Sequence, residues 1–177
     1  MEDFLGINIQ RKDEEIHLTQ QHLIEKIIKY LNLDHDKLYS KTTPAAASKI
    51  LFSHKDSDEF DKSFHYRSVI GKLNHLENSC QPDISYAMHQ CARFSVDPRN
   101  KHADSIRWLG RYLKGTKEKG TILQPKLGNV LEVFVDADFA GNWNKEEIYD
   151  RDKARFRHGF IIMYKGCPVL HKSQFAC

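Results

Sequence analysis

The sequence lacks the features of a secreted or membrane-spanning protein. No apolar run approaches the roughly 20 residues that cross a bilayer, and no charged stretch followed by an apolar segment opens the chain, so we expect no secretory signal. The cysteines form no CxxC pair, and they stand at Cys80, Cys91, Cys167 and Cys177. We therefore expect reduced thiols in an intracellular protein, cytoplasmic or nuclear, with no membrane partner.

Motifs for common enzyme classes are also missing. The sequence contains no P-loop, no dinucleotide fingerprint and no nucleophile elbow. Its 10 histidines are scattered, without an HExxH pair or paired Cys/His spacing, so we expect no structural zinc site. Only 9 glycines and 5 prolines occur, which excludes collagen and low-complexity disorder. What remains is a chain of 177 residues, 40% hydrophobic and 29% charged, that forms one or two small domains.

The first third of the chain predicts a hairpin, a helix and a long connector. Residues 4–10 and 15–18 are expected to be strands joined by a polar turn, and Thr19 is a suitable N-cap for the helix that follows. Residues 34–62 show no hydrophobic period. A loop of this length is unusual inside a compact domain, so it indicates a boundary or a segment laid across another surface.

Helical periodicity dominates the middle of the chain, and alternation follows it. Apolar residues at i, i+3 and i+4 predict helices over 19–32, 64–79, 82–96 and 101–114, with Gly115 as the C-terminal cap of the last. After Gly120, alternating residues predict strands over 121–124, 131–138, 159–164 and 168–172. Turns as short as Lys165-Gly166 do not permit parallel crossovers, so the last three strands should form a meander. The sequence thus predicts an α+β fold.

The helix expected over 101–114 is strongly basic. From Arg99 to Lys119 there are seven cations and two acids, a balance of +5 against +3 for the whole chain. Arg107, Arg111 and Lys114 stand at i, i+4 and i+7 and so form one stripe. Either this stripe contacts phosphates, or it is a solvated helix face whose cations favour the C-terminal end of the helix dipole.

Asp136 and Asp138 lie two residues apart on one expected strand, so their carboxylates project from the same face. Such a pair can hold Mg²⁺, although one of the two can equally cap the strand end. A two-metal nuclease needs further carboxylates from other elements. The nearest candidates in the sequence are Glu146, Glu147, Asp150 and Asp152.

Five motifs occur in an order and at a spacing that resemble the Pol polyprotein of copia-type LTR retrotransposons. They are Phe4-Leu-Gly-Ile7 with Ile16-His-Leu-Thr-Gln20, Tyr66-Arg-Ser-Val-Ile-Gly-Lys-Leu-Asn74, Gln81-Pro-Asp-Ile-Ser-Tyr-Ala87, Arg111-Tyr-Leu-Lys-Gly-Thr116 and Val135-Asp-Ala-Asp-Phe-Ala-Gly141. The sequence departs from the family pattern at Gln81, where an arginine is usual. The resemblance covers nearly the whole chain. It implies the end of a reverse transcriptase followed by the start of an RNase H domain.

The resemblance implies three domains and a role for several residues. It implies a primer-grip-like palm hairpin over 1–18, a helical thumb and connection over 19–119, and a truncated RNase H-like domain with a partial antiparallel sheet over 120–177. Arg67, Gly71 and His75 would line the minor groove of a template–primer duplex. Asp136 would be the first metal-binding carboxylate of an RNase H site that uses Mg²⁺ in the parent enzyme.

The expected function is that of a polyprotein fragment. We expect it to contact RNA–DNA hybrid or DNA duplex without sequence preference, together with the remainder of the Pol polyprotein. The Tyr-x-Asp-Asp motif of the polymerase does not occur in the sequence, so we expect the chain to be catalytically inactive alone and to bind no metal stably. The alternatives are a minimal Mg²⁺-dependent nuclease that uses Asp136 and Asp138, and a structural remnant without function.

Overall fold

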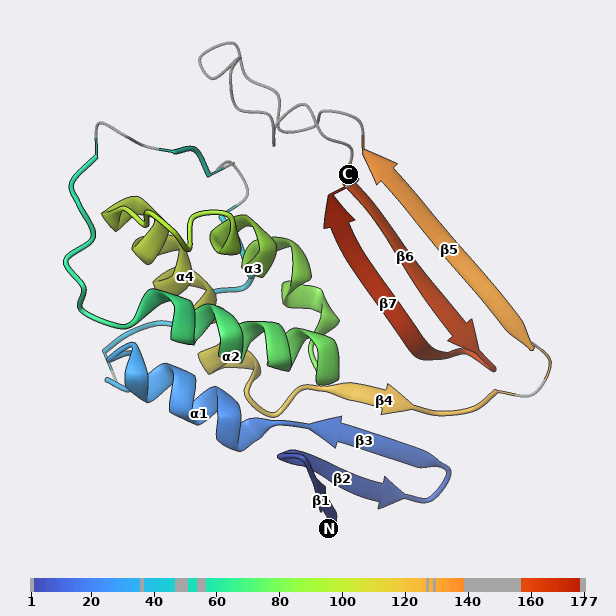
Figure 1. Ribbon diagram of the computed structural model, residues 1–177. Coiled ribbons are helices and arrows are strands. Elements are labelled where there is room, and N and C mark those ends of the chain that lie inside the picture. The colour runs from blue at the N-terminus through green and yellow to red at the C-terminus, as the bar shows by residue number, and fades with distance from the viewer. Residues whose placement is uncertain are drawn as a thin grey trace. The chain divides into compact units, whose positions relative to one another are not determined.

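The protein has a mixed α+β fold in the computed structural model (Figure 1). The structure describes residues 2–35, 37–46, 51–53, 57–126, 128, 130–138 and 157–175. The chain divides into two compact units, which are described separately below. The first contains Met1–Arg11 and His17–Thr121, and the second contains Lys12–Ile16 and Ile122–Cys177. Within the described residues, no helix is long and apolar enough to cross a membrane.

Four strands form a sheet of order β1-β2-β3-β4. They are β1 (Glu2–Phe4), β2 (Ile7–Lys12), β3 (Glu15–Thr19) and β4 (Thr121–Leu123). β1 and β2 are antiparallel, with Phe4 opposite Ile7. Leu5 and Gly6 make the turn between them with φ angles of 53° and 77°. β2 and β3 confirm the expected hairpin, whereas the short edge strand β1 was not predicted.

Four helices in the described residues enclose the hydrophobic core. They are α1 (Gln21–Tyr30), α2 (Tyr66–Ser79), α3 (Ser85–Ala92) and α4 (Asn100–Thr116), and the 3₁₀ turn η1 (Pro82–Ile84) leads into α3. The side chains buried most completely share the inward faces of these helices: Ile24, Ile27, Val69, Leu73, Leu76, Ile84, Ala103, Ile106, Leu109 and Leu113. The helical period therefore located the core correctly.

The helix ends differ from the prediction at several points. α1 begins one residue late, with Gln20 rather than Thr19 as its N-cap, because Thr19 still belongs to β3. α3 ends at Ala92, well before Asp97. Gly115 lies inside α4 and does not cap it. A Cβ at Gly115 would stand 2.8 Å from the Cβ of Ser40, so this glycine permits close approach of the connector to α4.

The second unit contains an antiparallel meander of order β5-β6-β7. Its strands are β5 (Leu131–Asp138), β6 (Arg157–Tyr164) and β7 (Cys167–Phe175). Lys165 and Gly166 join β6 to β7 with positive φ angles of 49° and 77°. The antiparallel order confirms the expected meander, the short Lys165-Gly166 turn joins β6 to β7, and both of these strands are longer than expected.

Candidate nucleic-acid interface

α2 presents one apolar and one polar face. His65 caps the helix, and its Nδ1 accepts a hydrogen bond from the backbone N–H of Ser68. The Tyr66 hydroxyl donates to the carbonyl oxygen of Cys91 at 2.9 Å, which anchors the first turn on α3. Because Val69 and Leu73 on the same side are fully buried, the opposite face of α2 is turned towards solvent.

The polar face of α2 contains the three residues assigned to the minor groove by resemblance. Arg67, Gly71 and His75 are all exposed and recur every four residues. A Cβ at Gly71 would meet no atom within 4 Å, so close helix packing does not explain the glycine. The only carboxylate of α2, Glu77, is 3% exposed and faces inward. The exposed face therefore presents hydrogen-bonding groups and a cation without an opposing acid.

Two residues of this face are held by neighbours outside α2. The Nε of Arg67 donates to the carbonyl oxygen of Ser95 at 3.0 Å, and its terminal nitrogens make no further hydrogen bond to the described residues. The Nε2 of His75 lies 3.0 Å from the Nε2 of Gln20, a residue that is 1% exposed at the start of α1. A buried amide thus orients the His75 ring.

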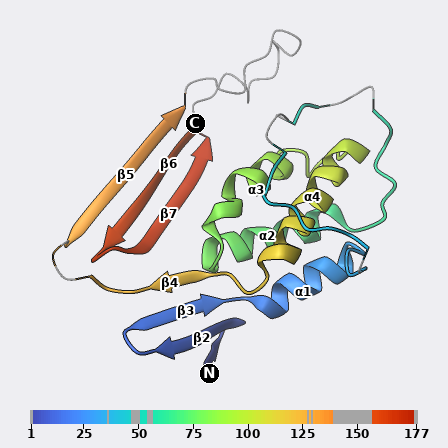
Figure 2. The same cartoon turned by 180° about the vertical axis from the view of Figure 1, so that it is seen from behind.

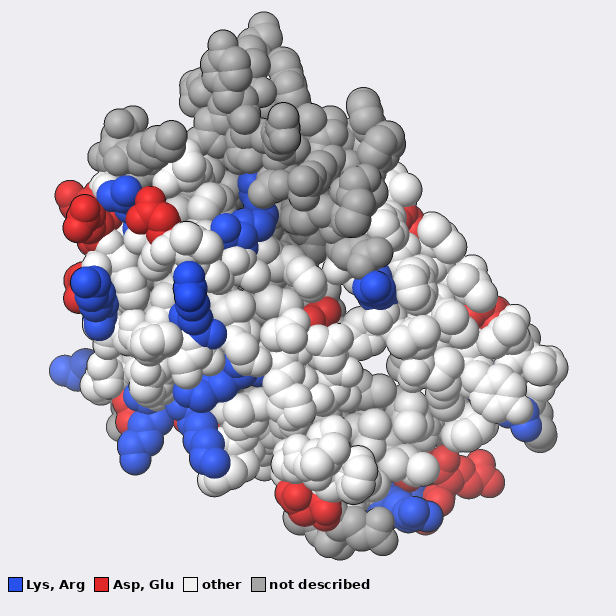
Figure 3. Space-filling model, in the orientation of Figure 1, with Lys and Arg blue, Asp and Glu red and all other residues white. Residues whose placement is uncertain are grey.

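Cations from α1 extend the polar face of α2. The ammonium group of Lys72 on α2 lies 4.2 Å from the ring centroid of Tyr30 on α1, which joins the two helices at the surface. Lys26 and Lys29 of α1 are exposed. Figure 3 shows Lys and Arg side chains gathered over the region of α1 and α2, with few acidic side chains among them.

The basic stripe on α4 makes contacts within the protein. Arg107 donates to Asp104 at 2.9 Å and to the hydroxyl of Ser63 at 2.7 Å. It also lies 3.7 Å from Asp61. A hydrogen bond from the Ser63 backbone N–H is the main reason that the pKa of Asp61 lies below its ordinary value, so this carboxyl remains ionised beside Arg107. The guanidinium of Arg107 therefore already contacts Asp104, Ser63 and Asp61 within the protein.

Arg111 and Lys114 hold the connector against α4. The Nε of Arg111 donates to the carbonyl of Tyr39 at 2.8 Å, and Lys114 donates to the carbonyls of His35 and Leu38 at 2.6 and 3.3 Å. Figure 2 shows the connector passing across α4. The stripe therefore has a structural use, and the remaining donors of Arg111 and Lys114 are the ones available to a phosphate.

The predicted metal site is only partly described. Asp136 is exposed on β5 opposite Gly159 of β6. Asp138 ends β5, but its side chain lies outside the described residues, as do Glu146, Glu147, Asp150 and Asp152. In the described part of the chain, no three His, Cys, Asp or Glu side chains come close enough to hold a metal ion. Asp136 alone does not fit a two-metal site, which needs carboxylates from several elements.

Sequence reasoning missed the residues that support the interface. Gln20 reaches His75 across 55 positions of the sequence, and the Lys72–Tyr30 contact joins two helices on either side of the connector. One signal was present: Gln20 is a polar residue directly before the apolar stripe of α1, where capping residues are common. Its side-chain amide contacts His75 of α2 instead of capping α1, and only the tertiary structure reveals this partner.

Comparison with known proteins identifies relatives along nearly the whole chain. The chain is 31% identical over 173 residues to the retrovirus-related Pol polyprotein from transposon RE1 of Arabidopsis thaliana, a match that covers 97% of the chain and 11% of that polyprotein. It is 30% identical over 175 residues to the putative transposon Ty5-1 protein of Saccharomyces cerevisiae, which covers 98% of the chain and 53% of that protein. The Pol polyprotein from transposon TNT 1-94 of Nicotiana tabacum is 24% identical over 180 residues, covering 98% of the chain and 13% of that polyprotein.

The chain is therefore much shorter than these relatives, since it spans 11% of the RE1 polyprotein and about half of the Ty5-1 protein, 53%. No protein-family model and no solved structure matches it.

Proposed function

We propose that the chain forms the thumb and connection of a reverse transcriptase, because it is homologous over nearly its whole length to copia-type retrotransposon Pol polyproteins. In this proposal the exposed face of α2 lies along the minor groove of the template–primer duplex. The duplex is an RNA–DNA hybrid or DNA, and it is held without regard to its sequence.

The exposed face of α2 carries the proposal. With a rise of 1.5 Å per residue, Arg67 and His75 lie about 12 Å apart along the helix axis, with Gly71 between them. A polymerase must follow a duplex of any sequence, which favours contacts to sugars and phosphates over base-specific contacts. An acid-free face with a central glycine suits close approach to a negatively charged backbone.

The stripe on α4 is a secondary contact in this proposal. Arg111 and Lys114 already donate to connector carbonyls, so only their remaining donors meet phosphates. Arg107 adds charge more than hydrogen bonds, because its nitrogens face Asp104, Ser63 and Asp61.

For the second unit we propose the start of an RNase H-like domain. The support is a meander of three antiparallel strands, with Asp136 on the first strand as the resemblance implies. In the parent enzyme Asp136 would be one ligand of Mg²⁺, completed by carboxylates from other elements, and Asp138 belongs to the same motif. By itself this chain would bind nucleic acid and not cleave it.

Gly71→Ala separates binding from folding. Replacing an exposed helical glycine by alanine should stabilise the protein by about 0.5–1 kcal/mol, because the added methyl group meets nothing in the structure. If α2 lies against a duplex, the same methyl group should weaken binding. We expect a Kd of about 10⁻⁴–10⁻⁶ M for an RNA–DNA hybrid at physiological salt, measured by fluorescence anisotropy, and a severalfold weaker value for Gly71→Ala.

His75→Ala and His22→Ala form a matched pair for the same assay. Both histidines are exposed on helices, His75 on α2 and His22 on α1. His75→Ala should weaken binding, and His22→Ala should not. Unchanged affinity in both Gly71→Ala and His75→Ala would remove α2 from the interface. Absence of any duplex binding by the wild-type chain would favour the structural-remnant alternative.

A further inference from the structure

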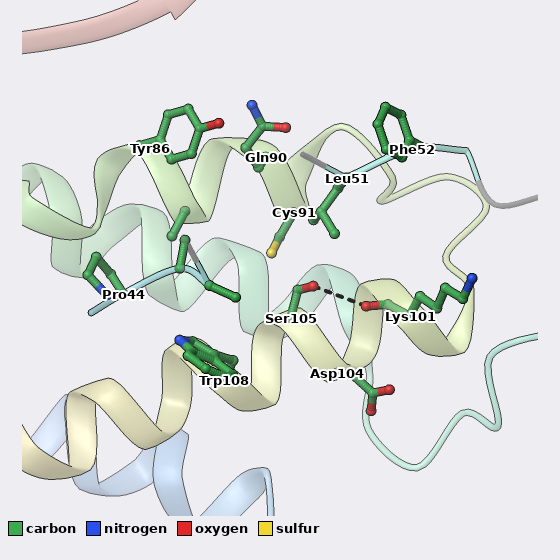
Figure 4. Close-up of a pocket in the computed structure, with 13 residues that line it drawn as sticks. Pro44, Leu51, Phe52, Tyr86, Gln90, Cys91, Lys101, Asp104, Ser105 and Trp108 are labelled. Atoms are coloured by element: carbon green, nitrogen blue, oxygen red, sulfur yellow. Dashed lines mark hydrogen bonds between the residues drawn. The ribbon is translucent and has the colours of Figure 1, made fainter. Parts of the chain in front are cut away.

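A pocket of about 560 Å³ opens in the first unit between α3, α4 and the connector. Its volume lies within the range of small-molecule sites. Most of its lining is apolar, and the side chains used below are Tyr86, Gln90 and Cys91 on α3 and Lys101, Asp104 and Trp108 on α4. Figure 4 shows the two helices on opposite sides, with Pro44 near Tyr86 and Trp108 and with Lys101 towards the far end.

One end of the pocket is aromatic. The Nε1 of Trp108 donates to the carbonyl of Thr43 at 3.0 Å, and the ammonium group of Lys41 lies 3.8 Å from the centroid of the Trp108 ring. These contacts fix the orientation of the indole. Tyr86 lines the pocket from α3. Rigid aromatic side chains on both helices favour a flat ring as the ligand.

The middle of the pocket contains an unsatisfied hydrogen-bond donor. Gln90 is 3% exposed, and its Oε1 accepts a hydrogen bond from Nη1 of Arg93 at 3.1 Å. Its Nε2 is buried and has no hydrogen-bond partner in the described part of the chain. Leaving such a group unpaired is costly, and most buried polar groups in proteins are paired. An acceptor on a bound molecule would satisfy it.

The other end of the pocket offers a cation. Lys101 is exposed, and its ammonium group has no hydrogen bond or ion pair among the residues that the structure describes. The nearby carboxylate of Asp104 is offset by Arg107, whose Nη1 lies 2.9 Å away. Lys101 and Trp108 are seven residues apart on α4, about 10 Å along the axis, so a ring and an anionic group on one small molecule reach both ends.

We propose that this pocket binds a small molecule with a flat aromatic ring, a hydrogen-bond acceptor and an anionic group. Nucleoside monophosphates and aromatic carboxylates with a ring nitrogen share this chemistry. The ring lies against the indole of Trp108, the acceptor receives a hydrogen bond from Nε2 of Gln90, and the anion faces Lys101. Cys91 lines the pocket as an unreactive thiol, because burial raises its pKa to about 12 and keeps it neutral.

The indole N–H resonance of Trp108 provides the test. The chain has 2 tryptophans, so a Trp143→Phe background leaves Trp108 as the only indole signal in a ¹H–¹⁵N spectrum. The probes are adenosine monophosphate, adenosine, ribose 5-phosphate and quinoline-6-carboxylate, whose ring nitrogen is an acceptor. We expect saturable shifts with adenosine monophosphate or quinoline-6-carboxylate, and the stronger of these two identifies the source. Adenosine should bind more weakly and ribose 5-phosphate hardly at all.

Variants of Gln90 and Lys101 examine the assigned contacts. Gln90→Leu should weaken the aromatic probes roughly tenfold. Gln90→Glu keeps an acceptor for Arg93 but removes the donor. If Gln90→Leu does not fold, the affinity of Gln90→Glu for the probes tests the same contact. Lys101→Ala should weaken the anionic probes roughly two- to fivefold and leave adenosine unchanged, and Lys119→Ala is its matched surface control.

Three results would overturn the proposal. They are no saturable shift of Trp108 with any probe, an equal effect of ribose 5-phosphate, or affinities that do not change in the Gln90 variants. None of these outcomes depends on whether α2 binds a duplex.

Discussion

His102 is a single buried side chain that joins three segments of the first unit. It is 0% exposed, and its Nδ1 accepts a hydrogen bond from the backbone N–H of Arg99 at 3.0 Å, at the start of α4. Its Nε2 lies 2.6 Å from the carbonyl oxygen of Phe52 in the connector. Both contacts suit the neutral ring with its proton on Nε2. The ring also stacks on Phe94, with centroids 3.9 Å apart.

We expect His102→Leu to destabilise the protein substantially. Leucine fills a similar volume but removes the hydrogen bonds of His102 with the Arg99 N–H and the Phe52 carbonyl, at about 1–3 kcal/mol for each. Urea unfolding followed by circular dichroism would measure the loss. His22→Leu, at an exposed position of α1, should change stability by less than about 0.5 kcal/mol. Equal stability of the two variants would contradict this account of His102.

At the scale of elements, contacts with α4 hold the connector in place. Besides the contacts of Arg111 and Lys114, the backbone N–H of Lys41 donates to the carbonyl of Arg111 at 3.2 Å, and Gly115 allows Ser40 to approach. The sequence shows only an aperiodic stretch here. The polar groups that anchor it are cations on a helix far along the chain, and composition alone leaves open whether these cations face solvent or contact phosphates.

Arg111→Lys distinguishes anchoring from phosphate contact. Lysine keeps the charge but loses the hydrogen bond from Nε to the Tyr39 carbonyl, so we expect a loss of about 1 kcal/mol in stability and faster amide exchange in residues 37–46. If charge alone acts on the duplex, the slope of log K against log salt should stay the same.

Replacing Arg107, Arg111 and Lys114 together by Ala should flatten the salt slope by about 0.9 for each phosphate that the wild-type side chains neutralise. Lys119→Ala serves as the control cation. A triple variant that loses stability but keeps the full slope would make the stripe purely structural.

The elements that could be predicted from the sequence are those with local causes. The period of Ile24, Ile27 and Ile28 marks α1, and the Lys165-Gly166 turn requires β6 and β7 to be antiparallel. The strand over 121–124 was also predicted, but the place of β4 beside β3 was not, because it depends on a partner about a hundred residues away in the sequence. Within the site, exposure of Arg67, Gly71 and His75 follows from the apolar side of α2, whereas Gln20 as the support of His75 does not.

At the scale of the whole molecule, the order of motifs carried more information than any single residue. The resemblance to copia-type Pol polyproteins is confirmed by relatives that match 97–98% of the chain at 24–31% identity. Each motif alone is short, and its residues serve ordinary structural ends, as Gly115 does beside Ser40. Their sequence order reflects common descent, which local physics does not encode. The α+β fold class followed from periodicity, and the resemblance to Pol polyproteins followed from the order of the motifs.

The meander of the second unit exposes a broad apolar face. Residues directly opposite on antiparallel strands share a face, so the register groups Leu131 with Tyr164, Val133 with Ile162 and Val135 with Phe160. On β5 the exposed fractions are 63% for Leu131, 55% for Val133 and 73% for Val135. Among the described strands β5 pairs only with β6, so it is an edge strand of this sheet. An exposed apolar edge strand is a site of self-association.

We therefore expect the purified chain to self-associate through β5, and Val133→Thr with Val135→Thr to reduce this. Threonine keeps the β-branched shape that suits a strand but exposes a hydroxyl in place of a methyl group. Sedimentation velocity at increasing protein concentration should show a smaller shift to large species in the double variant. Phe134→Thr, on the other face of the same strand and 56% exposed, is the matched control. If Phe134→Thr reduces association as much as the double variant does, the apolar face is not the cause, and unpaired β5 backbone becomes the explanation.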